Sequence, residues 1–273
     1  MKIRPAAVAG YFYPGDSKEL KTQINKYFAQ AVSEIYPNKI FGIVSPHAGY
    51  QYSGLTAAYA YNLLRDKFIE NVIIISPSHR EYFPGCCIYD GDAYATPLGI
   101  VEVNKEMSRG ITDGSKNIFF GENGHKLEHA LEVQIPFLQS VLANFKIVPI
   151  VMGDQSKIFV DELAEQLAKV VDEKTIIVAS SDMSHFYSAE EANRLDSVVE
   201  EKINQFVYDG LQTALDEKKC EACGGGPIIS MMKSASIYGY KKSLVLHRSD
   251  SGDVTGDKSE VVGYLSAVIY GGD

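Results

Sequence analysis

Three histidines of this chain follow apolar runs that are typical of buried strands. His47 ends the segment IFGIVSPH, His79 ends NVIIISPSH, and His185 ends TIIVASSDMSH, in which Asp182 stands where the other two segments have proline. The carboxyl ends of neighbouring parallel strands meet at one edge of an open α/β sheet, and such sheets bind their ligands there. We therefore expect these side chains to lie together, as a metal site or an acid–base site.

A cysteine with a glycine-rich flank is the next candidate. Cys223 lies in CEACGGGPIISMM, just before a predicted apolar helix. The positive end of a helix dipole lowers the pKa of a nearby thiol and favours the thiolate, which is the form that binds metals. The alternative is a structural cysteine behind a flexible turn. Cys220 and Cys223 form a single CxxC, only half of a structural zinc site, and the adjacent Cys86 and Cys87 are expected to face opposite sides of a strand.

His185 and Asp182 are the candidates for catalysis. An imidazole beside a metal can act as a general acid or base, and Asp182 would orient it or bind the substrate. The alternative role is local, because Asp or Ser in SSDMSHFY can cap a helix that begins near residue 188.

The segment HKLEHALEVQIPFLQ adds further polar candidates. If it is one helix, His125, His129 and Glu132 lie near one face, and burial of that face would make His129 or Glu132 supporting partners of the metal ligands. A solvated face is the alternative. The zinc-protease motif is absent, since Lys126 follows the first histidine. Tyr50 belongs to a group of early tyrosines that form either the wall of a binding cleft or half-buried aromatic packing.

The elements that must position these residues alternate along the chain. Strands alternating with helices predict βαβ units and a mainly parallel sheet covered on both faces, with the last strand added antiparallel near an edge. Pro136 is expected to kink or split its helix. The expected strands are 40–45, 71–76, 86–89, 145–151, 175–180, 243–248 and 261–270, and the expected helices are 17–31, 54–66, 128–143, 157–171, 188–208 and 227–238.

Composition narrows the functional classes. The 273 residues are 45% hydrophobic and 22% charged, with a net charge of −9, which argues against nonspecific binding to nucleic acid or to an anionic membrane. No run approaches the roughly 20 apolar residues of a membrane-spanning helix, and the first residues lack the apolar region of a signal peptide. We expect a cytoplasmic protein with reduced cysteines.

Several motifs together resemble the Memo family. They are RPAAVAGYFYP, SPHAGYQYSG, the PSH at 77–79, EHALEVQIPFLQ, SSDMSHF and EACGGGPI, in consistent order over residues 4–228. The resemblance implies a single domain over residues 1–273, folded as a three-layer αβα sandwich similar to the LigB class of extradiol dioxygenases. It implies metal ligands at His47, His79 and Cys223, with His185 lining the same pocket. It also implies pathway partners with an Ammecr domain and with radical-SAM chemistry.

One departure from the dioxygenases keeps the function open. Those enzymes hold Fe(II) with two histidines and a carboxylate, whereas here a thiolate would be the third ligand, which favours softer ions such as Cu(I) and is itself oxidisable. Fe(II) or Cu(I) is expected, and Zn(II) also suits the donor set. Three hypotheses follow: a metal-dependent oxidoreductase acting on a small molecule, a noncatalytic metal carrier or peptide-binding adaptor, and a metal-assisted hydrolase.

Overall fold

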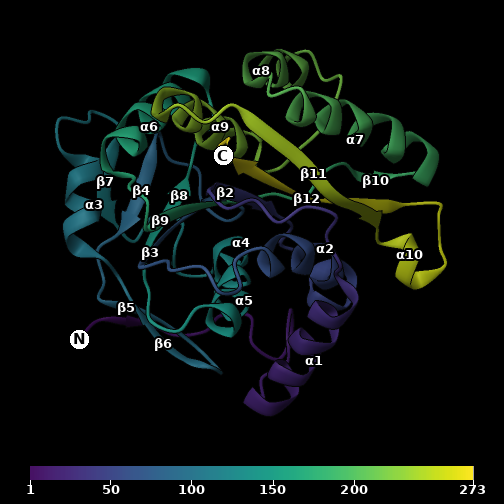
Figure 1. Cartoon of the computed structure of the whole chain (residues 1–273), viewed down its shortest axis with the longest axis horizontal. Coiled ribbons are helices and arrows are strands. Elements are labelled where there is room, and N and C mark those ends of the chain that lie inside the picture. Colours follow the sequence, from purple (N-terminus) through teal and green to yellow (C-terminus); the bar gives the residue numbers. More distant parts are fainter. Residues whose placement is uncertain (273) are drawn as a thin grey trace.

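One mixed sheet forms the centre of the molecule (Figure 1). The computed structural model describes residues 1–272, and within them nine strands pair in the order β10-β12-β2-β9-β3-β8-β4-β7, with β11 also pairing along β12. The strands of this sheet are β2 (Ile40–Ser45), β3 (Asn71–Pro77), β4 (Cys86–Tyr89), β7 (Ile118–Gly121), β8 (Lys146–Met152), β9 (Thr175–Ser180), β10 (His185–Tyr187), β11 (Lys242–Asp250) and β12 (Val261–Tyr270).

The four central strands β2, β9, β3 and β8 are parallel, while β12 runs antiparallel to β2. The expected antiparallel final strand is thereby confirmed. On the other side, β4 is antiparallel to β8 and parallel to β7. A small second sheet is formed by β1 (Ile3–Arg4), β5 (Ala93–Thr96) and β6 (Gly99–Glu102).

Helices cover both faces of the main sheet, so the expected αβα architecture is confirmed (Figure 1). One face packs against α1 (Ser17–Gln30), α2 (Tyr50–Asn62), α4 (His129–Glu132) and α5 (Gln134–Val141). The other packs against α3 (Lys105–Thr112), α6 (Lys157–Val170), α7 (Ala189–Asn204), α8 (Tyr208–Asp216) and α9 (Gly225–Tyr238). The short α10 (Gly252–Thr255) lies between β11 and β12.

The central strands are apolar throughout because each has two buried faces. In β3, Val72 and Ile74 pack into one core cluster, whereas Ile73 and Ile75 pack into the other. The neighbouring cysteines of β4 follow the same alternation: Cys87 joins the first cluster and Cys86 the second, as predicted.

The predicted helix 128–143 is divided in two. Pro136 has no N–H to donate to the carbonyl four residues earlier, and the chain turns at Val133 between α4 and α5. His125 lies in turns before α4, so the expectation that His125, His129 and Glu132 share one helical face is wrong. The predicted helix 188–208 is also shorter, ending at Asn204 before α8.

The sequence pattern does not predict eight short helices and strands that the structure contains. These are β1, β5, β6, β7, β10, α3, α8 and α10, each nine residues or fewer. Two- to four-residue strands carry too little periodicity to distinguish from loops, since they form where a partner strand is already in place.

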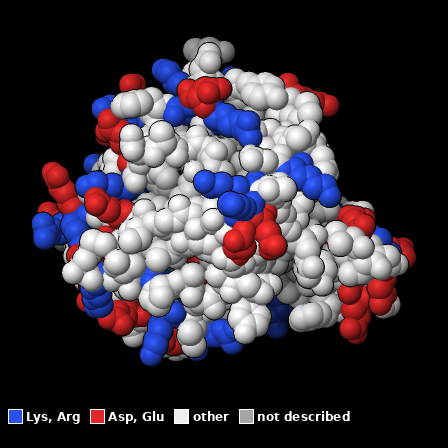
Figure 2. All heavy atoms as spheres, turned by 90° about the horizontal axis from the view of Figure 1, so that it is seen from below, with Lys and Arg blue, Asp and Glu red and all other residues white. Residues whose placement is uncertain are grey.

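Charged side chains of both signs are interspersed on the face drawn in Figure 2, where small groups of Lys or Arg neighbour groups of Asp or Glu. In residues 1–272, no helix has the length and apolar content required to cross a membrane.

Candidate metal centre

The carboxyl edge of the parallel strands brings the predicted ligands together. His47 follows β2, His79 follows β3, and Cys223 precedes α9. Strand β9 pairs with both β2 and β3, so the two histidines flank its end. The ligand atoms of His47, His79 and Cys223 all lie within 4.8 Å of one another, and Cys223 Sγ is 3.1 Å from His47 Nε2. The structure therefore assembles one donor cluster from segments far apart in the sequence.

A serine at the end of β9 determines which nitrogen of His47 is free. The Ser180 hydroxyl donates to the Ala130 carbonyl at 2.7 Å and accepts from Gln134 Nε2 at 2.8 Å. His47 Nδ1, 2.9 Å from the same hydroxyl, must then donate its proton to Ser180 Oγ. His47 Nε2 is left with its lone pair facing Cys223. Burial, followed by the nearby His79, lowers the pKa of His47 well below its ordinary value, so the ring is neutral.

Glu128 orients His79 in the same way. His79 Nδ1 donates to Glu128 Oε1 at 2.9 Å, and the His79 backbone N–H donates to Oε2 at 2.7 Å. The Glu128 carboxylate is 1% exposed and also accepts from the Ala130 N–H at 2.9 Å. Burial alone would raise the pKa of Glu128, but the hydrogen bonds from His79 and from the Ala130 N–H outweigh it and lower the pKa to about 2. This carboxylate–histidine pair leaves the lone pair of His79 Nε2 available to bind a metal. Metal-bound histidines are commonly held by such a carboxylate.

Cys223 is held against the end of β9. The Asp182 N–H donates to Cys223 Sγ at 3.2 Å, and the Cys223 N–H donates to the Asp182 carbonyl at 3.1 Å. At Gly224, a Cβ would lie 2.1 Å from the Ser180 carbonyl oxygen, so only glycine permits this close approach. Gln155 braces the loop from the other side, donating to the Cys223 carbonyl at 2.7 Å.

The expected lowering of the Cys223 pKa is wrong for the metal-free site. Although part of this residue remains exposed, its sulfur is enclosed, and desolvation together with the negative charge of Asp182 raises the pKa. These effects outweigh the Asp182 N–H, which stabilises the thiolate. The thiol is neutral until a cation is present to bind the deprotonated sulfur.

Asp182 and His185 have separate positions at this edge. The buried Asp182 carboxylate accepts from the His47 backbone N–H at 2.7 Å, and its other oxygen is 4.0 Å from His47 Nε2. Desolvation raises the pKa of Asp182 despite the hydrogen bond from His47. His185 begins β10 and faces the adjoining pocket. Neither residue caps a helix, since the N-cap of α7 is Ser188; their catalytic roles stay a prediction.

His129 lies against both histidine ligands. Its ring centroid is 5.4 Å from that of His47 and 4.7 Å from that of His79. Its Nδ1 is buried and lies 3.3 Å from Glu128 Oε1, and His129 forms a second group of close ligand atoms with His79 and Glu128. Burial and the proximity of His47 lower the pKa of His129 to about 4, so the ring is neutral at pH 7.

Glu132 belongs to a different set of contacts. Its carboxylate, 0% exposed, forms an ion pair with Arg4 and accepts from the Tyr13 hydroxyl at 2.5 Å. The backbone N–H groups of Ala7 and Val8 complete its coordination at 2.8 and 3.1 Å. It therefore holds the N-terminal segment in place and makes none of these bonds to a metal ligand.

His125 is fully partnered beside Glu132. Its Nε2 donates to the Cys87 carbonyl at 3.0 Å and its Nδ1 accepts from the Tyr94 hydroxyl at 2.7 Å. Arg4 donates to the carbonyls of His125 and Glu128, at 2.9 and 2.7 Å. The Arg4 cluster (Arg4, Tyr13, Tyr94, His125 and Glu132) thus anchors the segment that carries Glu128. Tyr50 packs in the core, donating its hydroxyl to the Val133 carbonyl at 2.6 Å.

The donor set fits a single metal ion. Metal–nitrogen bonds of about 2.0–2.1 Å and metal–sulfur bonds of about 2.3 Å require ligand atoms spaced much as those of His47, His79 and Cys223 are. Two imidazoles and one thiolate suit Fe(II), Cu(I) or Zn(II), and three protein ligands leave room for a further ligand.

A pocket of about 520 Å³ adjoins the donor cluster. His129, Asp182 and His185 border it, so a small molecule bound there lies next to the residues that surround the metal ligands. Apolar and aromatic lining with a few convergent polar groups is typical of ligand-binding sites.

Three supporting residues were missed by reasoning from the sequence. Glu128 directly precedes His129 in the sequence. No local motif indicates that it bonds to His79, which is 49 residues away. Ser180 ends β9 where Ser45 ends β2, which was an available signal. Gln155 has no motif that marks it.

Comparison with known proteins adds an independent finding. Residues 4–268 match the family model described as Memo-like protein. A MEMO1 family protein of Thermoplasma volcanium is 41% identical over 267 residues, covering 97% of this chain and 98% of that protein. MEMO1 family proteins of Nitrosopumilus maritimus and Sulfurisphaera tokodaii are 39% and 38% identical, covering 96% and 97% of this chain and 98% of each relative.

Proposed function

The chain belongs to the Memo-like protein family, and from this premise and the geometry of its donor cluster we propose that it is a metal-dependent oxidoreductase of a small molecule. His47 Nε2, His79 Nε2 and Cys223 Sγ would hold one ion, Fe(II) or Cu(I). Such an ion supplies one-electron chemistry and an open position for a further ligand.

The observation that carries the proposal is the pocket beside the donor cluster. A carrier needs only ligands and an entry path, whereas an enzyme also needs a shaped space for the substrate next to the metal. The pocket of about 520 Å³ shares His129, Asp182 and His185 with the surroundings of the cluster.

The protein residues have distinct roles in this proposal. His185, which is partly exposed at the pocket, transfers a proton to or from the substrate. His129 borders the pocket and is neutral at pH 7, so it can form a hydrogen bond with the substrate without adding positive charge. Asp182 positions the backbone of His47 and the sulfur of Cys223 through the bonds described above.

A noncatalytic metal carrier is the second candidate, favoured by the sulfur ligand itself. Thiolate binds Cu(I) well and is oxidisable beside activated oxygen, which is a liability in an oxygen-using enzyme. A carrier would bind Cu(I) tightly and consume neither oxygen nor substrate.

The first test is the metal content of protein purified without oxygen. Wild type is compared with Cys223→Ser and with Cys220→Ser, a matched control that changes a buried cysteine three positions away and outside the donor cluster. We expect about one ion per chain in wild type and in Cys220→Ser, and an affinity at least about a hundredfold lower in Cys223→Ser, since the thiolate is one of only three protein ligands.

The outcomes separate the candidates. If wild-type protein binds none of Fe(II), Cu(I) and Zn(II), the metal proposal is wrong. Iron-loaded protein that binds neither nitric oxide nor any small molecule in the pocket contradicts the oxidoreductase and favours the carrier. Ester hydrolysis by the Zn(II) form under strict anaerobiosis would instead favour a hydrolase.

A further inference from the structure

The pocket beside the metal centre has aromatic walls. Phe12, Tyr52, Phe186 and Tyr264 line it, and Phe12 packs on His129 with ring centroids 4.6 Å apart. The inner end is formed by Asp182 and His129, which are largely buried, whereas Phe186 is exposed. Four aromatic side chains therefore line the pocket together with His129 and Asp182, which contact the metal ligands His47 and Cys223.

Phe186 is held in an uncommon backbone conformation at this pocket. Its φ is 64°, in the left-handed region that costs a non-glycine residue about 1–2 kcal/mol, and its side chain is 71% exposed. A register shift in the pairing of β10 with β12, between His185 and Tyr187, accompanies this conformation. The surrounding structure must hold a residue in this conformation, and it keeps Phe186 at the lining of the pocket.

The charge of the pocket is negative. Asp257 and Glu260 line its exposed end, and no Lys or Arg of the described residues is among the lining residues. Hydrogen bonds from Ser259 lower the pKa of Asp257, which keeps it ionised. Glu260 has no side-chain partner within residues 1–272. The nearest lysine in sequence, Lys258, is engaged by Asp250 and Asp253 at 2.8 and 2.6 Å.

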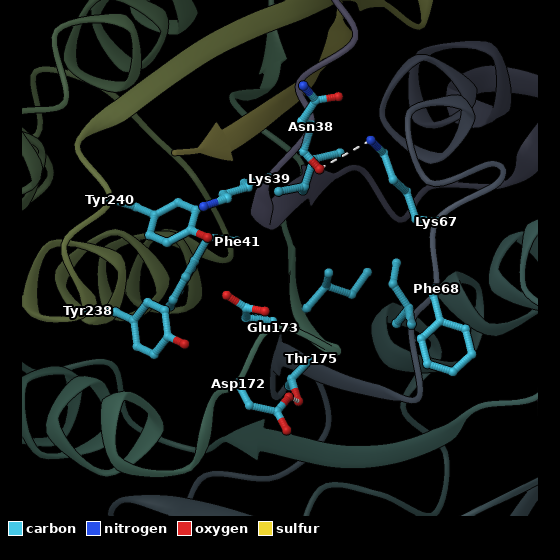
Figure 3. Close-up of a pocket in the computed structure, with 13 residues that line it drawn as sticks. Asn38, Lys39, Phe41, Lys67, Phe68, Asp172, Glu173, Thr175, Tyr238 and Tyr240 are labelled. Atoms are coloured by element: carbon cyan, nitrogen blue, oxygen red, sulfur yellow. Dashed lines mark hydrogen bonds between the residues drawn. The ribbon is translucent and has the colours of Figure 1, made fainter. Parts of the chain in front are cut away.

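A second aromatic pocket shows that this charge pattern is not general. It measures about 210 Å³ and lies at the amino edge of the strands, with Tyr238, Tyr240 and Phe68 around it (Figure 3). Asp172 and Glu173 line this pocket too, but Lys39 and Lys67 line it with them, so its charges balance. In Figure 3, Lys67 donates to the Asn38 carbonyl at one side of the opening.

We propose that the pocket beside the metal centre binds a small molecule that joins an aromatic ring to a protonated amine. The ring packs between the aromatic walls, and the ammonium group is attracted both by the aromatic faces and by the carboxylates of Asp257 and Glu260. Carboxylate and phosphate ligands are repelled by the same groups. The proposal rests on the proposed function, because it names the substrate class of that site.

The test uses two probes of nearly equal size and opposite charge. Tyramine and 4-hydroxyphenylacetate are titrated calorimetrically into the metal-containing protein under anaerobic conditions. We expect tyramine to bind at least about tenfold more tightly, since two carboxylates and the ring faces act in the same direction. Equal or tighter binding of 4-hydroxyphenylacetate, or no detectable binding of tyramine, overturns the proposal.

A double variant locates the effect. Asp257→Asn with Glu260→Gln removes both charges at exposed positions while keeping the Asp257 oxygen that accepts from Ser259. We expect it to weaken tyramine binding about tenfold and to leave 4-hydroxyphenylacetate no weaker than before. Asp172→Asn with Glu173→Gln, in the second pocket, is the matched control for net charge and should bind tyramine as wild type does.

The same titration into Cys223→Ser separates this proposal from the metal function. Tyramine bound by a variant without metal supports the pocket assignment even if the metal proposal fails. If metal-loaded wild-type protein does not bind tyramine, the proposed substrate class is wrong, whereas the proposal of a metal site is unaffected.

Discussion

Two buried polar clusters contact the segment 125–132, and they differ in how their polar atoms are satisfied. In the Arg4 cluster, Glu132 accepts from Arg4, Tyr13 and two backbone N–H groups, and both nitrogens of His125 are bonded. In the donor cluster, the supporting bonds instead turn His47 Nε2, His79 Nε2 and Cys223 Sγ toward one another, and the only bond among these three atoms joins Cys223 Sγ and His47 Nε2 at 3.1 Å. A saturated cluster is built for rigidity, whereas metal-binding atoms that converge from separate segments indicate a site for a ligand.

The two clusters share one segment, and this gives the saturated cluster a role in the site. Arg4 binds the carbonyls of His125 and Glu128, so the N-terminal segment fixes the turn from which the Glu128 carboxylate reaches His79. The Arg4 cluster therefore helps to orient the metal ligand His79 indirectly, through Glu128.

The largest expected effect tests whether the Arg4 cluster is structural. Arg4→Met leaves Glu132 buried without its partner, so the free energy of unfolding should fall by about 3–5 kcal/mol, measured by denaturant unfolding of metal-free protein. Lys2→Met is the control, since the ion pair of Lys2 with Asp90 is exposed to solvent and contributes little to stability. A loss from Arg4→Met no larger than that of the control would contradict the comparison.

A smaller effect, on metal affinity, is expected from removing the carboxylate that orients His79. Glu128→Gln removes the charge behind His79 while keeping an oxygen that can accept from Nδ1, and metal affinity should fall about 10–100-fold. Competition with a chelator of known affinity measures this change. Glu122→Gln, an exposed carboxylate on the same segment, should leave the affinity unchanged. Affinities of Glu128→Gln within threefold of wild type would break the assignment.

The smallest effect concerns the pH dependence of the Arg4 cluster. Burial lowers the pKa of His125 to about 4 from its ordinary 6.5, so below pH 6.5 the unfolded chain binds the proton more strongly than the folded protein does. Stability is therefore lost as the pH falls, by about 1 kcal/mol from His125 between pH 7.5 and 5.5.

Metal-free Cys223→Ser is the protein in which to measure this, so that metal release does not add to the change. His125→Gln, which cannot titrate, should show a shallower loss over the same pH range. An identical slope in both proteins would show that His125 is protonated as readily in the folded state as in the unfolded one.

Local pattern sufficed to predict much of the fold. The apolar runs at β2, β3, β8 and β9 identify buried strands because both of their faces are covered, and the longer helices show clear start signals, such as Asp16 before α1. Failures fell on short elements and on the segment 125–132, where helical spacing suggested one face and the chain formed turns followed by a four-residue helix.

The sequence by itself predicted that His47, His79, His185 and Asp182 would meet at one edge, because each follows a buried parallel strand and such strands end together. The structure brings His47 and His79 into one cluster and places Asp182 and His185 at the adjoining pocket. Only the tertiary structure decided which polar residues serve that edge. Glu128 reaches His79, Ser180 reaches His47, and Arg4 takes Glu132 away from the site, over separations of 49, 133 and 128 residues. Such pairings depend on where the packed layers place each turn, and no local spacing encodes them. The same holds for the Cys223 thiol, whose pKa follows from the enclosure and charge that folding assembles around it and not from the helix that begins beside it.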